Sequence, residues 1–240
     1  MLSNFASIDT YLLTKINGTW YHPALDPFFR LVSNFEKLGW VGAVPILSIA
    51  IFCGNRWRYA LLLALLAVGG ADLSATALKE IVHRPRAYET ETIRKVEKYR
   101  YTSKSGGFPS NHAANTMAAM TIVAWHFRKK KWAAALCMCV PALVGYSRVY
   151  LGVHYPSDVL AGFAIGGAVA ASILLLHYFA PVISFEPGRE RRFSWRGLIY
   201  LFLFFAVIYL CALAARTSHH PVPTRGSTAS PSFPANSVFL

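Results

Sequence analysis

The stretch SRVYLGVHYPSD, residues 147–158, separates two long apolar runs. It places a guanidinium (Arg148), an imidazole (His154) and a carboxylate (Asp158) within one short turn. Charged groups between apolar segments are costly unless they pair with one another or hold an anion. The stretch therefore predicts two membrane helices joined by a turn, with a candidate anion-binding site at that turn.

The residues around the turn have spacings suited to chemistry. Pro156 fits the first turn of a helix, where its missing N–H costs nothing, so we expect a helix to begin there or one residue earlier. Asp158 follows His154 by four residues, so its carboxylate can hold one imidazole nitrogen and leave the other free as a nucleophile. Gly152 eases the turn, and Arg148 would offer a planar fork to phosphate oxygens. A helix cap with an interfacial His and Arg explains this stretch equally well.

A second polar cluster, GGFPSNH at residues 106–112, precedes an apolar helical run. Ser110 is expected at the N-cap of that helix, with free backbone N–H groups just behind it. Such a helix N-terminus binds anions. His112 lies beside it, placed to give a proton to a leaving oxygen.

A third cluster follows the apolar run that ends near Lys79 and includes HRPR at residues 83–86. On a continuing helix Lys79 and Arg86 share a face, and Arg84 points elsewhere. Pro85 can end the helix before that point.

Together the three clusters resemble the type 2 phosphatidic acid phosphatases, which share their site with the vanadium haloperoxidases. That family's pattern is a lysine, six residues and Arg-Pro, then Pro-Ser-Gly-His, then Ser-Arg, five residues, His, three residues and Asp. The third block is complete here, whereas Asn111 replaces the glycine of the second and Ala87 replaces the proline after Arg86. Three ordered blocks within residues 72–158 make the resemblance specific.

The resemblance implies a two-step displacement that needs no metal or other cofactor. His154 would attack phosphorus and form a phosphohistidine, Asp158 would orient it, and His112 would protonate the leaving group and then help activate water. The phosphate oxygens would be held by Lys79, Arg86, Ser110, the backbone N–H of Asn111, and Arg148. Phosphoryl transfer depends mainly on such positioning and charge stabilisation.

The composition predicts a membrane protein. Of 240 residues, 55% are hydrophobic and 15% charged, and the mean hydropathy is +0.38. We expect one all-α membrane domain over residues 1–215, a polytopic bundle of about six transmembrane helices. The net charge of +13 falls mainly in loops and accompanies no nucleic-acid motif. Anionic lipids and a membrane lipid substrate are therefore the expected partners, and neither nucleic acid nor a protein partner is predicted.

The apolar runs set the expected organisation of the chain. Residues 1–25 have apolar side chains along one helical face and no basic leader, which predicts an interfacial helix. The expected spans are residues 38–53, 58–82, 111–127, 132–150, 156–179 and 198–215. The tail, 216–240, is rich in Pro, Ser, Thr and Ala and is predicted to be disordered.

Two features inside the spans have more than one interpretation. Asp72 lies seven residues before Lys79 on the same helical face, so it either lines the cavity and steadies Lys79 or hydrogen-bonds to a neighbouring helix. The Cβ of Asn111 can crowd a phosphate where the family has none. The four cysteines lie in apolar runs without histidines at zinc spacing, and we predict neither disulfides nor a metal site.

Loop charges predict the orientation. Arg56, Arg58 and the basic turns at 128–131 and 189–196 fall on one side of a six-span arrangement, and all three blocks fall on the other. Because basic loops stay in the cytoplasm, the site is expected on the non-cytoplasmic face of the plasma (inner) membrane.

The favoured function is hydrolysis of a lipid-linked phosphate or diphosphate at that face. The short chain resembles undecaprenyl diphosphate phosphatases, with phosphatidylglycerophosphate, phosphatidate and lipid A phosphates as alternative substrates. An intramembrane serine protease using Ser110 lacks the glycines of a nucleophile turn and leaves the cationic residues without a role. A non-catalytic transporter or scaffold is disfavoured because no internal repeat is evident.

Overall fold

The computed structural model describes residues 2–33, 51–89 and 106–179, and beyond these only short pieces at 48, 183–184, 192–193, 199–200, 203 and 206–210. The expected spans at 38–53 and 198–215 lie largely outside the described residues, and the tail at 216–240 lies wholly outside them. The single domain expected over residues 1–215 therefore stays a prediction. The described chain is helical apart from one antiparallel pair of two-residue strands, β1 (Ile183–Ser184) and β2 (Arg192–Phe193), in which Ile183 pairs with Phe193.

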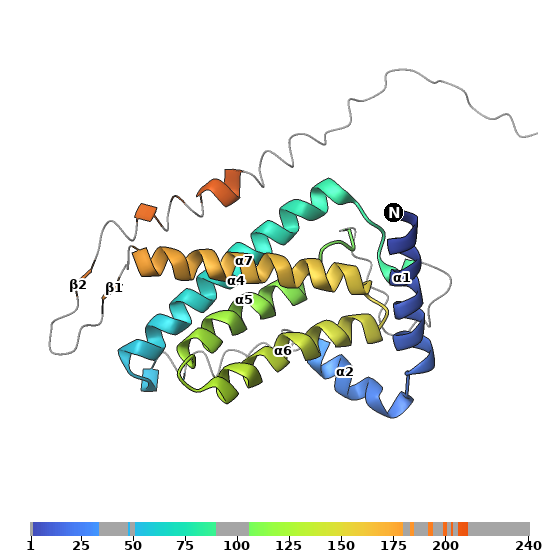
Figure 1. Ribbon diagram of the computed structural model, residues 1–240, viewed down its shortest axis with the longest axis horizontal. Coiled ribbons are helices and arrows are strands. Elements are labelled where there is room, and N and C mark those ends of the chain that lie inside the picture. Colours follow the sequence, from blue (N-terminus) through green and yellow to red (C-terminus); the bar gives the residue numbers. More distant parts are fainter. Residues whose placement is uncertain are drawn as a thin grey trace, which may run out of the picture.

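Four long helices form a bundle, and they match four of the expected spans to within a few residues (Figure 1). They are α4 (Asn55–Val82), α5 (Asn111–His126), α6 (Lys131–Tyr150) and α7 (Pro156–Phe179). Helix α5 lies at the centre and packs against the other three. Among the described residues, the segments long and apolar enough to cross a membrane are Asn55–Glu89, Lys131–Tyr150 and Pro156–Phe179. The membrane helix bundle expected from the sequence is thus confirmed.

Small residues allow α5 and α7 to pack backbone against backbone. A Cβ added at Gly166 would lie 2.1 Å from the carbonyl oxygen of Ala114, and one added at Gly162 would lie 2.6 Å from that of Ser110. Closely approaching helices with glycines four residues apart are typical of membrane proteins. This packing presses the first turn of α5 against α7 near its N-terminus.

Large apolar side chains also cover the outside of the bundle. Leu62, Leu65, Leu136, Leu143 and Leu160 are all exposed. Outward-facing leucines on long apolar helices are costly in water and expected in a lipid bilayer. The surface therefore agrees with a membrane-embedded bundle.

The N-terminal segment is helical, as expected, and lies across one end of the bundle (Figure 1). It comprises α1 (Leu2–Thr14), the π-helix η1 (Lys15–Thr19), the 3-10 helix η2 (Pro23–Leu25) and α2 (Asp26–Ser33). Only part of the expected apolar face of α1 is covered, because Leu13 is 1% exposed whereas Ile8 is 55% exposed. Leu13 packs with Ala87, Val149 and Tyr155 in a small core beneath this end.

Contacts with the end of α6 hold this segment in place. Asn17 Nδ2 donates to the carbonyl oxygen of Tyr150 at 2.8 Å, and the Tyr150 hydroxyl donates to the carbonyl oxygen of His22 at 2.8 Å. The rings of Phe29 and Tyr150 lie 4.3 Å apart, centroid to centroid. The N-terminal segment is therefore packed onto the bundle at the end where α6 stops and α7 begins.

Candidate active site

The first block follows a helix that ends earlier than the shared-face prediction requires. Helix α4 stops at Val82, and His83 adopts a left-handed conformation (φ 47°) with its N–H donating to the carbonyl oxygen of Lys79 at 3.2 Å. The helix therefore ends before Arg86, which is the alternative that Pro85 allowed, and Lys79 and Arg86 do not share a helical face. The chain turns instead, and both side chains are buried at the same end of the bundle.

The second block is pressed against the first. The Gly107 N–H donates to the carbonyl oxygen of Arg84 at 2.6 Å, and a Cβ at Gly107 would lie 2.9 Å from the carbonyl oxygen of Pro85. Glu89, in the 3-10 turn η4 (Ala87–Glu89), accepts the Arg86 N–H at 3.2 Å. Only glycine fits at position 107, and the close approach fixes the backbone that carries Arg86.

Ser110 links the second block to the third. It occupies the N-cap of α5, as expected, and its N–H donates to the carbonyl oxygen of Asp158 at 3.0 Å. Its hydroxyl makes no capping bond, and this buried oxygen has no hydrogen-bond partner among the described residues. A buried, unsatisfied hydroxyl at a helix N-terminus is rare in a folded protein and suits an anionic ligand.

The third block forms the turn between α6 and α7. Gly152 has φ 69°, and the N–H groups of Val153 and His154 both donate to the carbonyl oxygen of Arg148, at 3.0 and 3.3 Å. Helix α7 begins at Pro156, as expected. Asp158 then reaches back, and its Oδ2 accepts the Tyr155 N–H at 2.8 Å, which is half of a capping box. The turn between α6 and α7 therefore holds the Asp158 carboxylate, and the carboxylate stabilises that turn.

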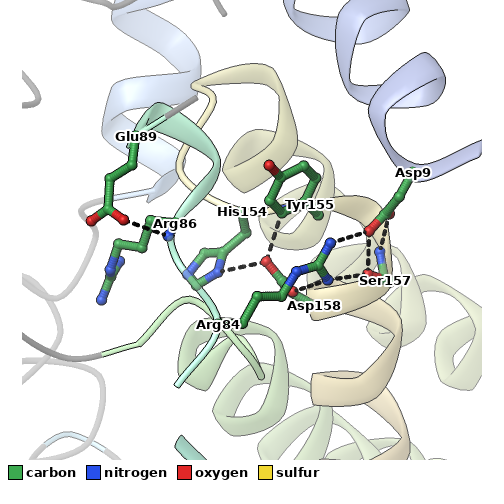
Figure 2. Close-up of polar contacts among 8 residues, drawn as sticks. All are labelled: Asp9, Arg84, Arg86, Glu89, His154, Tyr155, Ser157 and Asp158. Atoms are coloured by element: carbon green, nitrogen blue, oxygen red, sulfur yellow. Dashed lines mark hydrogen bonds and ion pairs between the residues drawn. The ribbon is translucent and has the colours of Figure 1, made fainter. Parts of the chain in front are cut away.

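His154 and Asp158 are both buried and face each other (Figure 2). His154 Nδ1 lies 3.5 Å from Asp158 Oδ2, which is ion-pair distance but too long for a good hydrogen bond. The other ring nitrogen, Nε2, is on the edge away from the carboxylate. This pairing gives the two nitrogens of the imidazole different surroundings.

Positive charge surrounds His154. Burial lowers the pKa of His154 well below its usual value. Nearby cationic groups lower it further, in decreasing order Arg148, Arg86, Lys79 and His112. These groups come from all three blocks, so the structure brings the predicted site residues together around one imidazole. That imidazole is neutral at neutral pH and keeps a lone pair for nucleophilic attack.

Arg148 is held by a residue that sequence reasoning missed. The guanidinium is almost fully buried, and its Nη1 donates to the carbonyl oxygen of Ser33 at 3.3 Å and to the Ser33 hydroxyl. Ser33 ends α2, so the N-terminal segment helps to place a cation of the third block. Nothing in the local sequence around Ser33 distinguishes it from an ordinary helix-terminal serine.

Arg84 contacts Asp158, whereas on a continuing helix it would point elsewhere. Its Nη1 donates to Asp158 Oδ1 at 2.8 Å and its Nη2 to Asp9 Oδ2 at 2.7 Å (Figure 2). The guanidinium also stacks on the Tyr155 ring, 4.1 Å from its centroid. The adjoining Pro85 gave Arg84 the letters of the family motif, and Asp9 is the only acidic residue among the first 25. Those two signals mark Arg84 and Asp9 singly, but they do not show that the two residues pair.

Asp72 and Asn111 contact each other. Asp72 Oδ1 accepts the side-chain amides of Asn111 at 2.8 Å and Asn115 at 3.0 Å, and Asn111 also donates to Thr76 at 3.1 Å. The helix-to-helix hydrogen bond is therefore realised, and Asp72 also lies near enough to Lys79 to act on its charge. The Asn111 side chain is directed to α4, so this departure from the family pattern ties α5 to α4.

The other departure, Ala87, is fully buried and packs with Leu13, Ala113 and Val149. Among residues 2–33, 51–89 and 106–179, no three His, Cys, Asp or Glu side chains gather in a way that could hold a metal ion. The cysteines in the part of the chain that the structure describes, Cys53, Cys137 and Cys139, are free thiols.

Comparison with known proteins agrees with this geometry. The PAP2 superfamily matches residues 60–182, just over half of the chain. The lipid A 4'-phosphatases of Bacteroides thetaiotaomicron and Porphyromonas gingivalis are 29% and 31% identical, over 70% and 72% of this chain and 76% and 74% of theirs. The solved transmembrane PAP2 type phosphatidylglycerolphosphate phosphatase from Bacillus subtilis shares the fold, with a TM-score of 0.60, 23% identity, and coverage of 78% of this chain and 90% of that one. The chain belongs to the PAP2 superfamily of membrane lipid phosphatases.

Proposed function

We propose that this chain hydrolyses a phosphate ester of a membrane lipid through a phosphohistidine on His154, without a metal, at the non-cytoplasmic face of the plasma membrane. The observation that carries the proposal is the buried, neutral imidazole of His154 among cationic groups from three separate blocks. A neutral nucleophile beside fixed positive charge is what attack on a phosphate group needs.

The first step forms a bond between His154 Nε2 and phosphorus and breaks the bond from phosphorus to the lipid oxygen. Nε2 is the attacking nitrogen because Nδ1 faces Asp158, whose negative charge stabilises the imidazolium that forms. His112, the second residue of α5, gives its proton to the leaving oxygen. It is half-buried, so it can exchange protons with solvent and still reach the site.

The second step reverses these roles. Water attacks the phosphohistidine, His112 takes the proton, and His154 leaves as the neutral imidazole. Throughout, the phosphate oxygens are held by Lys79, Arg86, Arg148, the Ser110 hydroxyl and the first N–H groups of α5, including that of Asn111. The Ser110 hydroxyl, which has no hydrogen-bond partner in the described part of the chain, supports this arrangement because a phosphate oxygen would satisfy it.

The charges at the far end of the bundle support the proposed orientation. Arg56, Arg58 and the four basic residues at 128–131 are exposed where α4 and α6 begin and α5 ends, opposite to the site. Basic turns favour the cytoplasmic side. The site then opens to the non-cytoplasmic side of the inner membrane.

A phosphate monoester on a lipid A-type sugar is the first substrate to test, because relatives named for that activity match over 70% and 72% of this chain. Undecaprenyl diphosphate, the substrate expected from the sequence, belongs in the same panel with phosphatidylglycerophosphate and phosphatidate. Purified protein in detergent micelles should release phosphate from at least one of them, equally well with and without EDTA. Release that EDTA abolishes, or no release from any substrate, would contradict the proposal.

The covalent intermediate can be tested separately. Brief exposure to a substrate labelled on its phosphate, followed by an alkaline quench, should leave label on the wild-type chain and none on His154→Ala. Label that persists on the His154→Ala variant would place the nucleophile elsewhere.

A further inference from the structure

We propose that Asp9, on helix α1, is a positioning residue for the reaction: through Arg84 and Ser157 it fixes the carboxylate of Asp158 and with it the ring of His154. The proposal rests on the proposed function, since it assigns His154 the nucleophile's role. Helix α1 precedes residues 60–182, which match the PAP2 superfamily, and no motif block includes it.

Asp9 is a buried carboxylate with several donors. Its Oδ1 accepts the Ser157 N–H at 2.9 Å, and its Oδ2 accepts from Arg84 Nη2 at 2.7 Å and from the Ser157 hydroxyl. Only 8% of the side chain is exposed. The Ser157 N–H belongs to the first turn of α7, where a helix favours a negative charge. The acid of α1 therefore caps the helix that carries Asp158.

Arg84 connects the two carboxylates. One of its terminal nitrogens binds Asp9 and the other binds Asp158 at 2.8 Å and the Ser157 hydroxyl at 2.7 Å. The planar guanidinium thus holds the acids in a fixed relation, as a flexible ammonium could not. Stacking on the Tyr155 ring restricts its rotation further.

The position of Asp158 depends on this bridge. Its Oδ1 is held by Arg84 and its Oδ2 by the Tyr155 N–H, and Oδ2 is also the oxygen that faces His154 Nδ1. The Arg84 side chain is 26% exposed. Without Asp9 the Arg84 guanidinium still pairs with Asp158 but can rotate toward solvent. The Asp158 carboxylate then rotates with it.

Charge balance gives Asp9 a second effect. With both acids ionised, the group formed by Asp9, Arg84 and Asp158 carries a net negative charge. That net charge stabilises the imidazolium of His154. When a neutral residue replaces Asp9, the charges of Arg84 and Asp158 cancel. The imidazolium that forms on His154 during attack on phosphorus is then stabilised less. Asp9 should therefore affect kcat more than substrate binding, because it does not contact the phosphate.

The decisive variant is Asp9→Asn in the full chain, assayed in detergent micelles on the panel lipid that wild type hydrolyses fastest. We expect kcat to fall about tenfold or more with KM within about twofold of wild type. Asp9→Glu, which keeps the charge, should recover part of the lost kcat. Asp26→Asn is the matched control, because the Oδ2 of Asp26 accepts from Arg30 at 3.3 Å and from the Tyr21 hydroxyl at 3.0 Å, both within the N-terminal segment. Its kcat should equal that of wild type.

Arg84→Lys tests the bridge from its other side and serves if Asp9→Asn does not fold. A lysine lacks the planar fork that holds the two carboxylates in a fixed relation, so kcat should again fall with little change in KM. If the two residues act along one path, the double variant should be no slower than the slower single variant. Losses that multiply would overturn the proposal.

The outcomes separate this proposal from a purely structural role for α1. A lower melting temperature with unchanged kcat per folded molecule in Asp9→Asn would make Asp9 structural only and overturn the proposal. An active wild type with an unimpaired Asp9→Asn would overturn this proposal alone. An inactive wild type would overturn it together with the proposed function.

Discussion

The two ends of the bundle hold histidines in different environments, one buried and one half-buried. At the site end, His154 faces a carboxylate and is surrounded by cationic groups. At the far end, His177 Nδ1 lies 3.1 Å from the Tyr59 hydroxyl and its ring meets Trp125 edge to face at 5.5 Å. Both of these contacts are with neutral side chains, as is typical of a packing residue. The two imidazoles therefore differ both in burial and in the charge around them.

The largest expected difference between the ends comes from replacing each histidine. His154→Ala should lower kcat by about four orders of magnitude or more, because the nucleophile is lost. His177→Gln, which keeps a polar partner for Tyr59, should stay within about threefold of wild type. Phosphate release measured side by side on the same lipid checks both. Equal losses in the two variants would remove the functional distinction between the ends.

A second test changes the packing that supports the site end. Gly162→Ala places a methyl group 2.6 Å from the carbonyl oxygen of Ser110, and Gly167→Ala meets nothing within 4 Å. The first change should cost about 3 kcal/mol, seen as a drop of about 10 °C in melting temperature, together with a loss of activity. The second should change neither measurement. A Gly162→Ala variant as stable and active as wild type would mean that α5 and α7 need not approach so closely.

A smaller effect is expected from the anchor of Arg148. Ser33→Ala removes the hydroxyl that the guanidinium donates to and should lower kcat/KM about tenfold, because an anion-binding cation becomes less well placed. Ser172→Ala is the matched control, since Ser172 donates to the carbonyl oxygen of Ala168 within its own helix, α7. Lipid titrations of the two variants give the comparison. Indistinguishable kcat/KM values would show that Arg148 holds its place without Ser33.

The smallest expected effect is on the pH profile. Because the pKa of His154 is lowered by burial and then by the charges of Arg148, Arg86, Lys79 and His112, the nucleophile should stay neutral to well below the ordinary histidine value of about 6.5. The acid limb of phosphohistidine formation should therefore lie below that pH. By the same linkage, His154 becomes protonated below about pH 6.5 in the unfolded chain but stays neutral in the folded chain. Its contribution to the free energy of unfolding therefore falls as the pH drops below about 6.5. Rapid-quench labelling across pH checks the profile, and an acid limb above 6.5 would contradict it.

Local sequence patterns predicted the parts of the site that depend on local structure. Pro156 marks the start of α7 and Ser110 the N-cap of α5, since both follow from preferences of a few neighbouring residues. The four described bundle helices follow from apolar length alone. The roles assigned to the predicted site residues stay proposals that the experiments above test.

Tertiary contacts account for what the patterns missed. A continuing helix would direct Arg84 away from Lys79 and Arg86, but the left-handed turn at His83 redirects Arg84 toward Asp158. Asp9 and Ser33 reach the site because the N-terminal segment packs across the end of the bundle. No periodicity within a helix tells which distant helix end it will meet, so such partners appear only in three dimensions.

The hydrogen bond from Ser157 to Asp9 joins positions 148 residues apart, and this has a consequence for biogenesis. Asp9 leaves the ribosome before Ser157, which follows on the order of ten seconds later at ordinary rates of translation. During that interval Asp9 cannot yet form its hydrogen bonds to Ser157. A nascent chain interrupted before α7 is inserted would therefore lack a working phosphatase centre. Phosphatase activity would appear only after α7 has been inserted.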